Sequence, residues 1–164
     1  GLARTFQGGR LFARLTVREN LEVAAIGGGV RGREARARIA GILDRLGLAD
    51  KADTVAGALP YGDERRVALG RAIALGPTFL LLDEPAAGLD ESETRELAGA
   101  IRDVRDEHGC GVLVVEHDMS LIMGLCERIH VLTKGRTLLV GAPETVRGDR
   151  GVQEAYLGTA DGDG

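Results

Sequence analysis

Two short apolar runs, separated by a helical pattern, constrain the fold of this chain more than any other feature of its sequence. The runs, Phe79–Leu82 and Gly111–Val115, are uniformly apolar, as expected for strands of a parallel sheet. The helical pattern between them has an apolar side formed by Leu97, Ile101 and Val104. Strand, helix and strand in this order predict a parallel crossover unit. Because the first run shows no polar alternation, we expect it to be buried on both faces of the sheet.

Three helices are predicted before the first of these strands. Thr16 and Glu19 have capping-box spacing, which indicates a helix that begins near Thr16 and ends at Gly27–Gly29. The second helix has its apolar residues on one face, and Gly47 is expected to cap its C-terminal end. The second and third helices are expected at about 33–46 and 63–75.

The C-terminal third predicts a short helix and a hairpin. The helix is expected near 119–127, and the strands 129–132 and 137–140 flank a turn at Lys134 and Gly135. The last residues, 158–164, are rich in glycine and aspartate and are expected to form a disordered tail.

Composition limits the classes of partner. The 164 residues include 21 Lys and Arg against 25 Asp and Glu, so the formal net charge of −4 provides no basic field for nucleic acid. The longest apolar stretches fall far below the roughly 18 residues that a membrane span needs. Cys110 and Cys126 have neither disulfide-framework nor metal-site spacing, which is typical of a reducing, cytosolic compartment.

Ionisable residues follow both predicted strands, where ligands bind in open parallel sheets. Asp83 and Glu84 follow the first strand, and His117 lies just beyond the second. A carboxylate such as Asp83 can hold Mg²⁺ through water, and Glu84 can orient or deprotonate a water that attacks a terminal phosphate. His117 could contact the same phosphate or relay a proton.

Each of these residues also has a purely structural interpretation. Asp83 and Glu84 could simply begin a loop, and His117 could be an ordinary loop histidine. Asp90, with Glu93 three residues later, could be the N-cap of the following helix. The functional interpretation rests on the joint occurrence of suitable groups after two strands of one unit.

A glycine-rich segment at 27–34 has the glycine spacing of a phosphate-binding loop but not its chemistry. Arg33 replaces the phosphate-binding lysine, and Glu34 replaces the hydroxyl that would bind Mg²⁺. We expect a flexible loop here, and no other segment supplies a phosphate-binding loop.

Four ordered motifs resemble those of ATP-binding cassette (ABC) ATPases. The sequence LLLDEPAAGLD at 80–90 resembles the Walker B segment, catalytic glutamate and D-loop. LPYGDERR at 59–66 resembles the signature sequence, RTFQ at 4–7 the Q-loop, and VEHD at 115–118 the histidine switch. The resemblance covers nearly the whole chain but begins at the Q-loop, so we expect an N-terminally truncated cassette without its Walker A loop.

The resemblance implies an α/β fold with a P-loop-type parallel sheet core, a helical signature subdomain and missing N-terminal strands. Residues 1–157 would form a partial nucleotide-binding domain. Its region at about 12–76 would include the helical subdomain, and 77–157 would carry the catalytic sheet and the hairpin, followed by the tail at 158–164.

The resemblance also implies an ATP hydrolase that uses ATP and Mg²⁺. Glu84 and His117 would be catalytic, Asp83 would be a metal residue, and Gln7 would approach Mg²⁺ and the attacking water. Family cassettes dimerise head to tail, so the partner would be a second cassette, identical or paralogous. Residues 6–19 would receive the coupling helix of a membrane permease, which would place the chain at the cytoplasmic face of the membrane.

In such a dimer the signature segment would bind the nucleotide held by the opposite cassette. Tyr61, Gly62 and Asp63 are the expected cofactor-binding residues, with the amides after Gly62 directed to the γ-phosphate. Asp90 would lie at the dimer interface. Pro60 replaces the usual serine and Asp63 the usual glutamine, which weakens the implied phosphate contact of Asp63.

In these departures the sequence is similar to cassettes of branched-chain amino acid importers. Cassettes of urea and amide importers are close alternatives. The double Arg at 65–66 and the EAYLG segment at 154–158 contribute to this similarity. A DNA-repair ABC ATPase is disfavoured because long heptad repeats and a basic patch are absent from the sequence. A degenerate, non-catalytic cassette that acts as an interaction module is a further alternative, for which weak ATP binding and poor solubility are expected.

Overall fold

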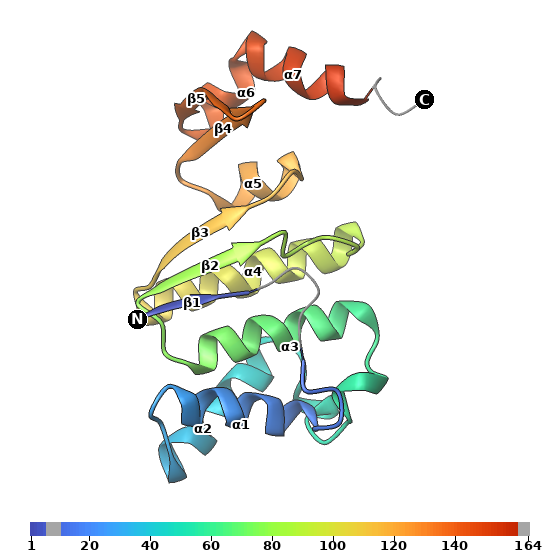
Figure 1. The fold of residues 1–164 in the computed structure, drawn as a ribbon, viewed down its shortest axis with the longest axis vertical. Coiled ribbons are helices and arrows are strands. Elements are labelled where there is room, and N and C mark those ends of the chain that lie inside the picture. Colours follow the sequence, from blue (N-terminus) through green and yellow to red (C-terminus); the bar gives the residue numbers. More distant parts are fainter. Residues whose placement is uncertain (6–10, 161–164) are drawn as a thin grey trace. The chain divides into compact units, whose positions relative to one another are not determined.

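A computed structural model describes residues 1–5 and 11–160 of the chain (Figure 1). The chain divides into two compact units, Gly1–His117 and Asp118–Gly164. The predicted subdivision at about 12–76 and 77–157 follows a different criterion and stays a prediction.

The N-terminal unit contains a three-stranded parallel sheet in the order β1 (Leu2–Arg4), β2 (Phe79–Asp83), β3 (Gly111–Val115). Parallel pairing of β2 with β3 confirms the predicted crossover unit, whose connecting helix is α4 (Glu91–His108). Sequence reasoning missed β1, a three-residue strand that pairs with β2 across more than 70 positions of the chain. Its short length leaves too few positions for a periodic pattern.

Three further helices make up the rest of this unit. They are α1 (Val17–Gly27), α2 (Gly32–Arg45) and α3 (Tyr61–Ala74), with short 3₁₀ turns at Ala49–Lys51 and Ala56–Ala58. The capping box of α1 forms as predicted between Thr16 and Glu19. The apolar face predicted for α2 is buried, and Gly47, at φ +63°, follows the helix in the left-handed conformation.

Two helix starts differ from prediction. Helix α3 begins at Tyr61, two residues before the expected start, with Pro60 as its N-cap. The predicted flexible loop at 27–34 is shorter than expected, since Gly32, Arg33 and Glu34 already belong to α2. Glu34 lies in the first turn of α2, where its negative charge complements the helix dipole.

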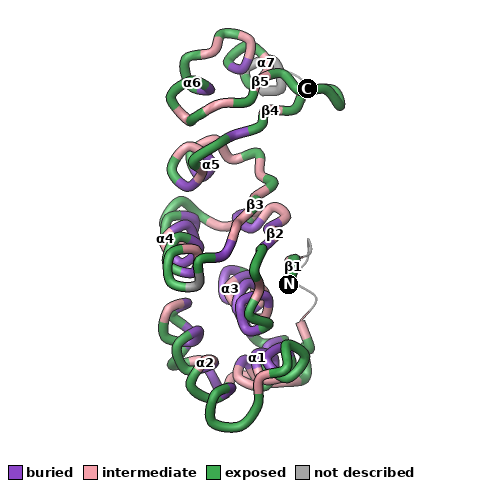
Figure 2. Tube along the Cα trace, turned by 90° about the vertical axis from the view of Figure 1, so that its left-hand side faces the viewer, coloured by how far each residue is buried: buried purple, intermediate pink, exposed green. Residues whose placement is uncertain are grey.

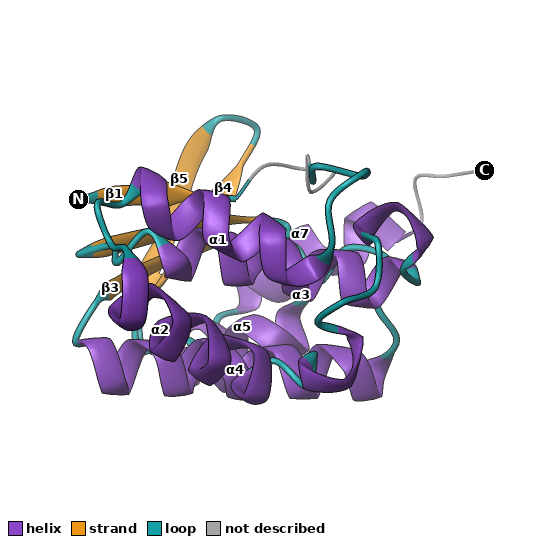
Figure 3. Ribbon diagram, turned by 90° about the horizontal axis from the view of Figure 1, so that it is seen from below, coloured by secondary structure: helices purple, strands orange, loops and turns teal. Residues whose placement is uncertain are grey.

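The two faces of the sheet differ, and the prediction that Phe79–Leu82 is buried on both of them is wrong. Leu80 and Leu82 point to the face covered by helices and are at most 1% exposed, whereas Phe79 on the other face is 58% exposed. In β3, Leu113 and Val115 share the register of that exposed face. Figure 2 shows buried and exposed stretches along β2, and Figure 3 shows α4 running along one side of the strands. Among the described residues of the N-terminal unit, Leu2, Phe79, Leu113 and Val115 on the exposed face are each more than half exposed.

The C-terminal unit consists of α5 (Met119–Leu125), the antiparallel hairpin β4 (Ile129–Thr133) and β5 (Arg136–Gly141), α6 (Pro143–Gly148) and α7 (Arg150–Ala160). The hairpin is confirmed, and α5 ends two residues before the predicted end. Helices α6 and α7 were not predicted.

The predicted disordered tail is wrong over its first three residues. Residues 158–160 lie in α7, which continues the helical pattern of the preceding turns, while 161–164 lie outside the described residues. Within the described part of the chain, no helix is long and apolar enough to cross a membrane. Both cysteines are free thiols, and burial raises the pKa of the Cys126 thiol.

Candidate functional site

Asp83, Glu84 and His117 meet at the carboxyl-terminal edge of the parallel sheet, as their positions after β2 and β3 predicted. Asp83 is the last residue of β2 and lies opposite Val115 of β3. The Nδ1 atom of His117 lies 4.0 Å from Oε1 of Glu84. The His117 side chain is 77% exposed and that of Glu84 is 34% exposed, so solvent or a ligand can reach both.

Strand β1 adds a residue that sequence reasoning did not assign to the site. Arg4 donates from Nη2 to Oδ2 of Asp83 at 2.9 Å, and the amide of Asp83 donates to the Thr5 hydroxyl at 3.3 Å. These contacts cross nearly 80 positions of the chain, so no local pattern reveals them. The only signal was the position of both residues in the segment that resembles the Q-loop.

Glu84 has a backbone conformation that a side chain with a β-carbon rarely adopts. Its φ is +44°, in the left-handed region. Its amide extends the β2–β3 ladder by donating to the Val115 carbonyl at 2.9 Å. The turn that follows is closed by the Ala87 amide, which donates to the Glu84 carbonyl at 3.3 Å. Such strained residues concentrate at functional sites.

A second group of predicted residues forms where α3 begins against the loop before α4. A β-carbon at Gly62 would collide with the Glu93 carboxylate, so glycine permits this approach. Gly88 has φ +78°, and a β-carbon there would lie 2.7 Å from Cε1 of Tyr61. The Tyr61 hydroxyl accepts hydrogen bonds from the Arg65 guanidinium, which stacks 4.8 Å from the ring centroid. The start of α3 is therefore packed closely against the loop that follows Glu84.

Asp63 and Asp90 have structural roles in this region. Asp63 is buried, and its Oδ2 lies 2.5 Å from Nζ of Lys51. Asp90 is the N-cap of α4 and forms a reciprocal capping box with Glu93. The N-cap interpretation of Asp90 is thus confirmed, and its predicted place at a dimer interface stays a prediction. Gln7 lies outside the described residues.

The donor set suits a cation that takes most of its ligands from a nucleotide and water. Among the residues that the structure describes, no three His, Cys, Asp or Glu side chains cluster as a protein-only metal site. Asp83 supplies one carboxylate, of which Oδ2 is held by Arg4. Magnesium is usually bound in this way, by one or two carboxylates together with phosphate oxygens and water.

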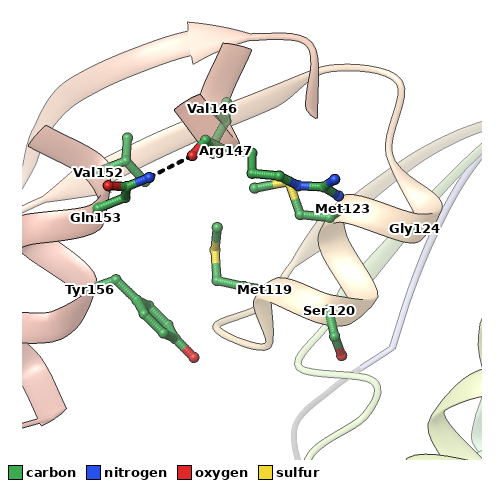
Figure 4. Close-up of a pocket in the computed structure, with 9 residues that line it drawn as sticks. All are labelled: Met119, Ser120, Met123, Gly124, Val146, Arg147, Val152, Gln153 and Tyr156. Carbon is green, nitrogen blue, oxygen red and sulfur yellow. Dashed lines mark hydrogen bonds between the residues drawn. The ribbon is translucent and has the colours of Figure 1, made fainter. Parts of the chain in front are cut away.

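The C-terminal unit holds a cavity of about 590 Å³ between α5, α6 and α7 (Figure 4). Met119, Met123, Val146 and Val152 form its apolar walls, and Tyr156 lies at its edge. None of the predicted site residues lines this cavity.

Comparison with known proteins agrees with this architecture. A family described as "ABC transporter" matches residues 1–87. The chain is 42% identical to the high-affinity branched-chain amino acid transport ATP-binding protein LivG of Escherichia coli strain K12, over 98% of the chain and 69% of LivG. It is 39% identical to BraF of Pseudomonas aeruginosa, with the same coverage.

A solved structure shows the same fold. The ADP conformation of MJ1267, an ATP-binding cassette of an ABC transporter, superposes with a TM-score of 0.82 at 26% identity, covering 96% of the chain and 68% of MJ1267. Three observations lead to the same assignment. They are the acids Asp83 and Glu84 at the end of β2, the match of more than half of the chain to one family, and this superposition. The chain belongs to the ABC transporter ATPase family.

Proposed function

We propose that this chain is the ATP-binding and ATP-hydrolysing part of an importer subunit for branched-chain amino acids. The observation that carries the proposal is the convergence of Glu84 and His117 at the sheet edge, 4.0 Å apart and both accessible. The identity to LivG and BraF, whose names specify branched-chain amino acid transport, supports the choice of solute. Urea or amide import remains the alternative of the same class.

In the proposed reaction Glu84 acts on the attacking water. Its carboxylate orients the water and accepts its proton as the bond between the water oxygen and the terminal phosphorus forms. The bond from that phosphorus to the bridging oxygen breaks in the same step, and ADP leaves with that oxygen. The exposed His117 imidazole contacts the terminal phosphate and holds it in line with that water. Asp83 would hold Mg²⁺ through water, and bound Mg²⁺ supplies Lewis-acid stabilisation of the phosphate charge. Arg4 keeps the Asp83 carboxylate in place.

A second cassette and a permease complete the proposed assembly. The amides at the start of α3, next to Tyr61 and Gly62, receive no side-chain cap from Pro60 and would bind the γ-phosphate of the nucleotide on the opposite cassette. Asp90 would lie at that interface, and Gln7 would approach Mg²⁺ and the water. Residues 6–19 would contact permease subunits, which would hold the cassette at the cytoplasmic face of the membrane.

The test is Glu84→Gln in the transporter assembled with its partner cassette and permease in proteoliposomes. Glutamine keeps the size of the side chain but cannot accept the proton, so we expect ATP turnover to fall by about 100-fold or more. ATP binding is expected to persist. Turnover is measured as phosphate release, and binding by nucleotide retention.

The matched control is Glu154→Gln, which removes an exposed carboxylate paired with Arg150 on α7. It is expected to leave turnover unchanged, because exposed pairs of this kind contribute little. Wild-type turnover in Glu84→Gln would show that Glu84 is not the base. Absence of ATP binding in the wild-type assembly would favour the degenerate, non-catalytic cassette.

A further inference from the structure

Glu116 is a buried carboxylate between the two loops that carry the proposed catalytic residues. It follows β3 directly and precedes His117. Its side chain is 1% exposed, whereas the adjacent His117 side chain is 77% exposed. Since a buried carboxylate is costly unless its oxygens accept hydrogen bonds, its partners indicate what it does.

The two oxygens of Glu116 accept from different loops. The Ala86 amide, in the loop after β2, donates to Oε1 at 3.0 Å. The His117 amide, in the loop after β3, donates to Oε2 at 2.9 Å, and Nδ1 of His117 lies 3.4 Å from the same oxygen. One side chain therefore ties together two segments that are 30 residues apart in the chain. Hydrogen bonds to an ionised acceptor are stronger than those between neutral groups.

This connection brackets the strained residue Glu84. On one side, the Glu84 amide is bonded to the Val115 carbonyl, and on the other, the Ala86 amide is bonded to Glu116. The chain bends between these two anchors, and Glu84 at the bend has φ +44°. A left-handed conformation of a residue other than glycine persists only where its surroundings enforce it.

We propose that Glu116 is a positioning residue: its carboxylate clamps the Ala86 amide to the His117 segment and thereby holds Glu84 and His117 in their mutual geometry. It does not touch the reacting atoms. The consequence for turnover rests on the proposed function, but the clamp itself does not. Its loss should loosen both loops together while β2 and β3 stay paired.

The first measurement is amide hydrogen exchange, resolved by residue, on the chain and on Glu116→Gln. Glutamine keeps one acceptor oxygen but faces the second amide with an NH₂ group, so one of the two bonds is lost. We expect exchange at Ala86 or His117 to rise about tenfold or more, with unchanged exchange at Leu81 and Leu113 in the strands. Glu154→Gln, the matched control, should leave all four amides at wild-type rates.

A variant that unfolds would not answer the question, so Glu116→Asp is measured in parallel. Aspartate keeps the charge but is one methylene shorter, and it cannot reach both amides. The same local rise in exchange is expected. Unchanged exchange at Ala86 and His117 in both variants would overturn the clamp, and so would an equal rise over the whole N-terminal unit, since that indicates general destabilisation.

The second measurement is ATP turnover in the assembled transporter. Loss of a clamp that positions Glu84 and His117 is expected to lower kcat about tenfold or more and to leave KM for ATP within about twofold, because both residues act on the bond-making step at the terminal phosphate rather than on binding of the rest of the nucleotide. Looser loops with wild-type kcat would overturn the positioning role. If the wild-type assembly hydrolyses no ATP, the proposed function fails, while the exchange results still decide whether Glu116 holds the two loops together.

Discussion

At the scale of single residues, two candidates for the site also have structural duties, and substitution can separate the two roles. Asp90 is the clearest case, because it caps α4 through the Glu93 amide at 2.8 Å and is also proposed to face a second cassette. Asp63, by contrast, is buried against Lys51, which accounts for its carboxylate without a nucleotide.

Asp90→Asn and Asp90→Ala are expected to differ in stability. Asparagine caps helices as well as aspartate, so the free energy of unfolding should change by less than about 0.5 kcal/mol, whereas alanine should lower it by about 1 kcal/mol. Denaturation with urea, followed by circular dichroism, measures both. Equal losses in the two variants would contradict a capping role. A loss of turnover in the stable Asp90→Asn variant would show a role beyond the cap.

At the scale of elements, the turn between β4 and β5 stands out as a two-residue loop in which both residues are left-handed. Lys134 has φ +47° and Gly135 has φ +75°, the geometry of a type I′ turn. Glycine adopts this conformation freely, whereas lysine has to bear steric strain. The hairpin therefore carries an unfavourable residue at its tightest point.

Lys134→Asn is expected to stabilise the hairpin by about 0.5 kcal/mol, because asparagine tolerates the left-handed conformation. Lys134→Val is expected to destabilise it by about 1 kcal/mol or more, since a β-branched residue there is an outlier. Hydrogen exchange of the β4 and β5 amides measures the difference. Identical protection in both variants and the wild type would mean that the turn does not hold this geometry in solution.

At the scale of the whole molecule, the exposed apolar face of the sheet in the N-terminal unit dominates the expected solution behaviour. Leu2, Phe79, Leu113 and Val115 are each more than half exposed and share one face by register. Contiguous apolar surface of this kind promotes association. On the opposite face, Leu80 and Leu82 of β2 are buried.

The chain is therefore expected to self-associate as its concentration rises. Leu113→Ser should reduce this association and leave the unfolding free energy nearly unchanged, because the side chain is 58% exposed. Leu80→Ser, at a fully buried position in the neighbouring strand, should lower stability by about 3 kcal/mol or more. Sedimentation velocity and urea denaturation test the pair. A monodisperse monomer at all concentrations would contradict the expectation.

The sequence by itself determined most of the helices and strands. It also placed the candidate catalytic residues at the carboxyl ends of β2 and β3. The capping boxes at Thr16 and Asp90, the apolar face of α2 and the runs that became β2 and β3 depend on residues a few positions apart, so local periodicity and capping chemistry suffice to predict them. The grouping of Asp83, Glu84 and His117 could also be predicted, because parallel strands bring their carboxyl ends to one edge of the sheet.

Only the tertiary structure decided which other groups join that edge and which face of the sheet is open. Arg4 reaches Asp83 across 79 positions, and Ala86 reaches Glu116 across 30, distances in sequence over which no periodic pattern operates. The left-handed backbone of Glu84 has no signature in its own side chain, since it is imposed by hydrogen bonds on either side. Apolar runs predict that β2 is a strand, but burial of each face depends on what packs against it, and that is a property of the folded chain alone.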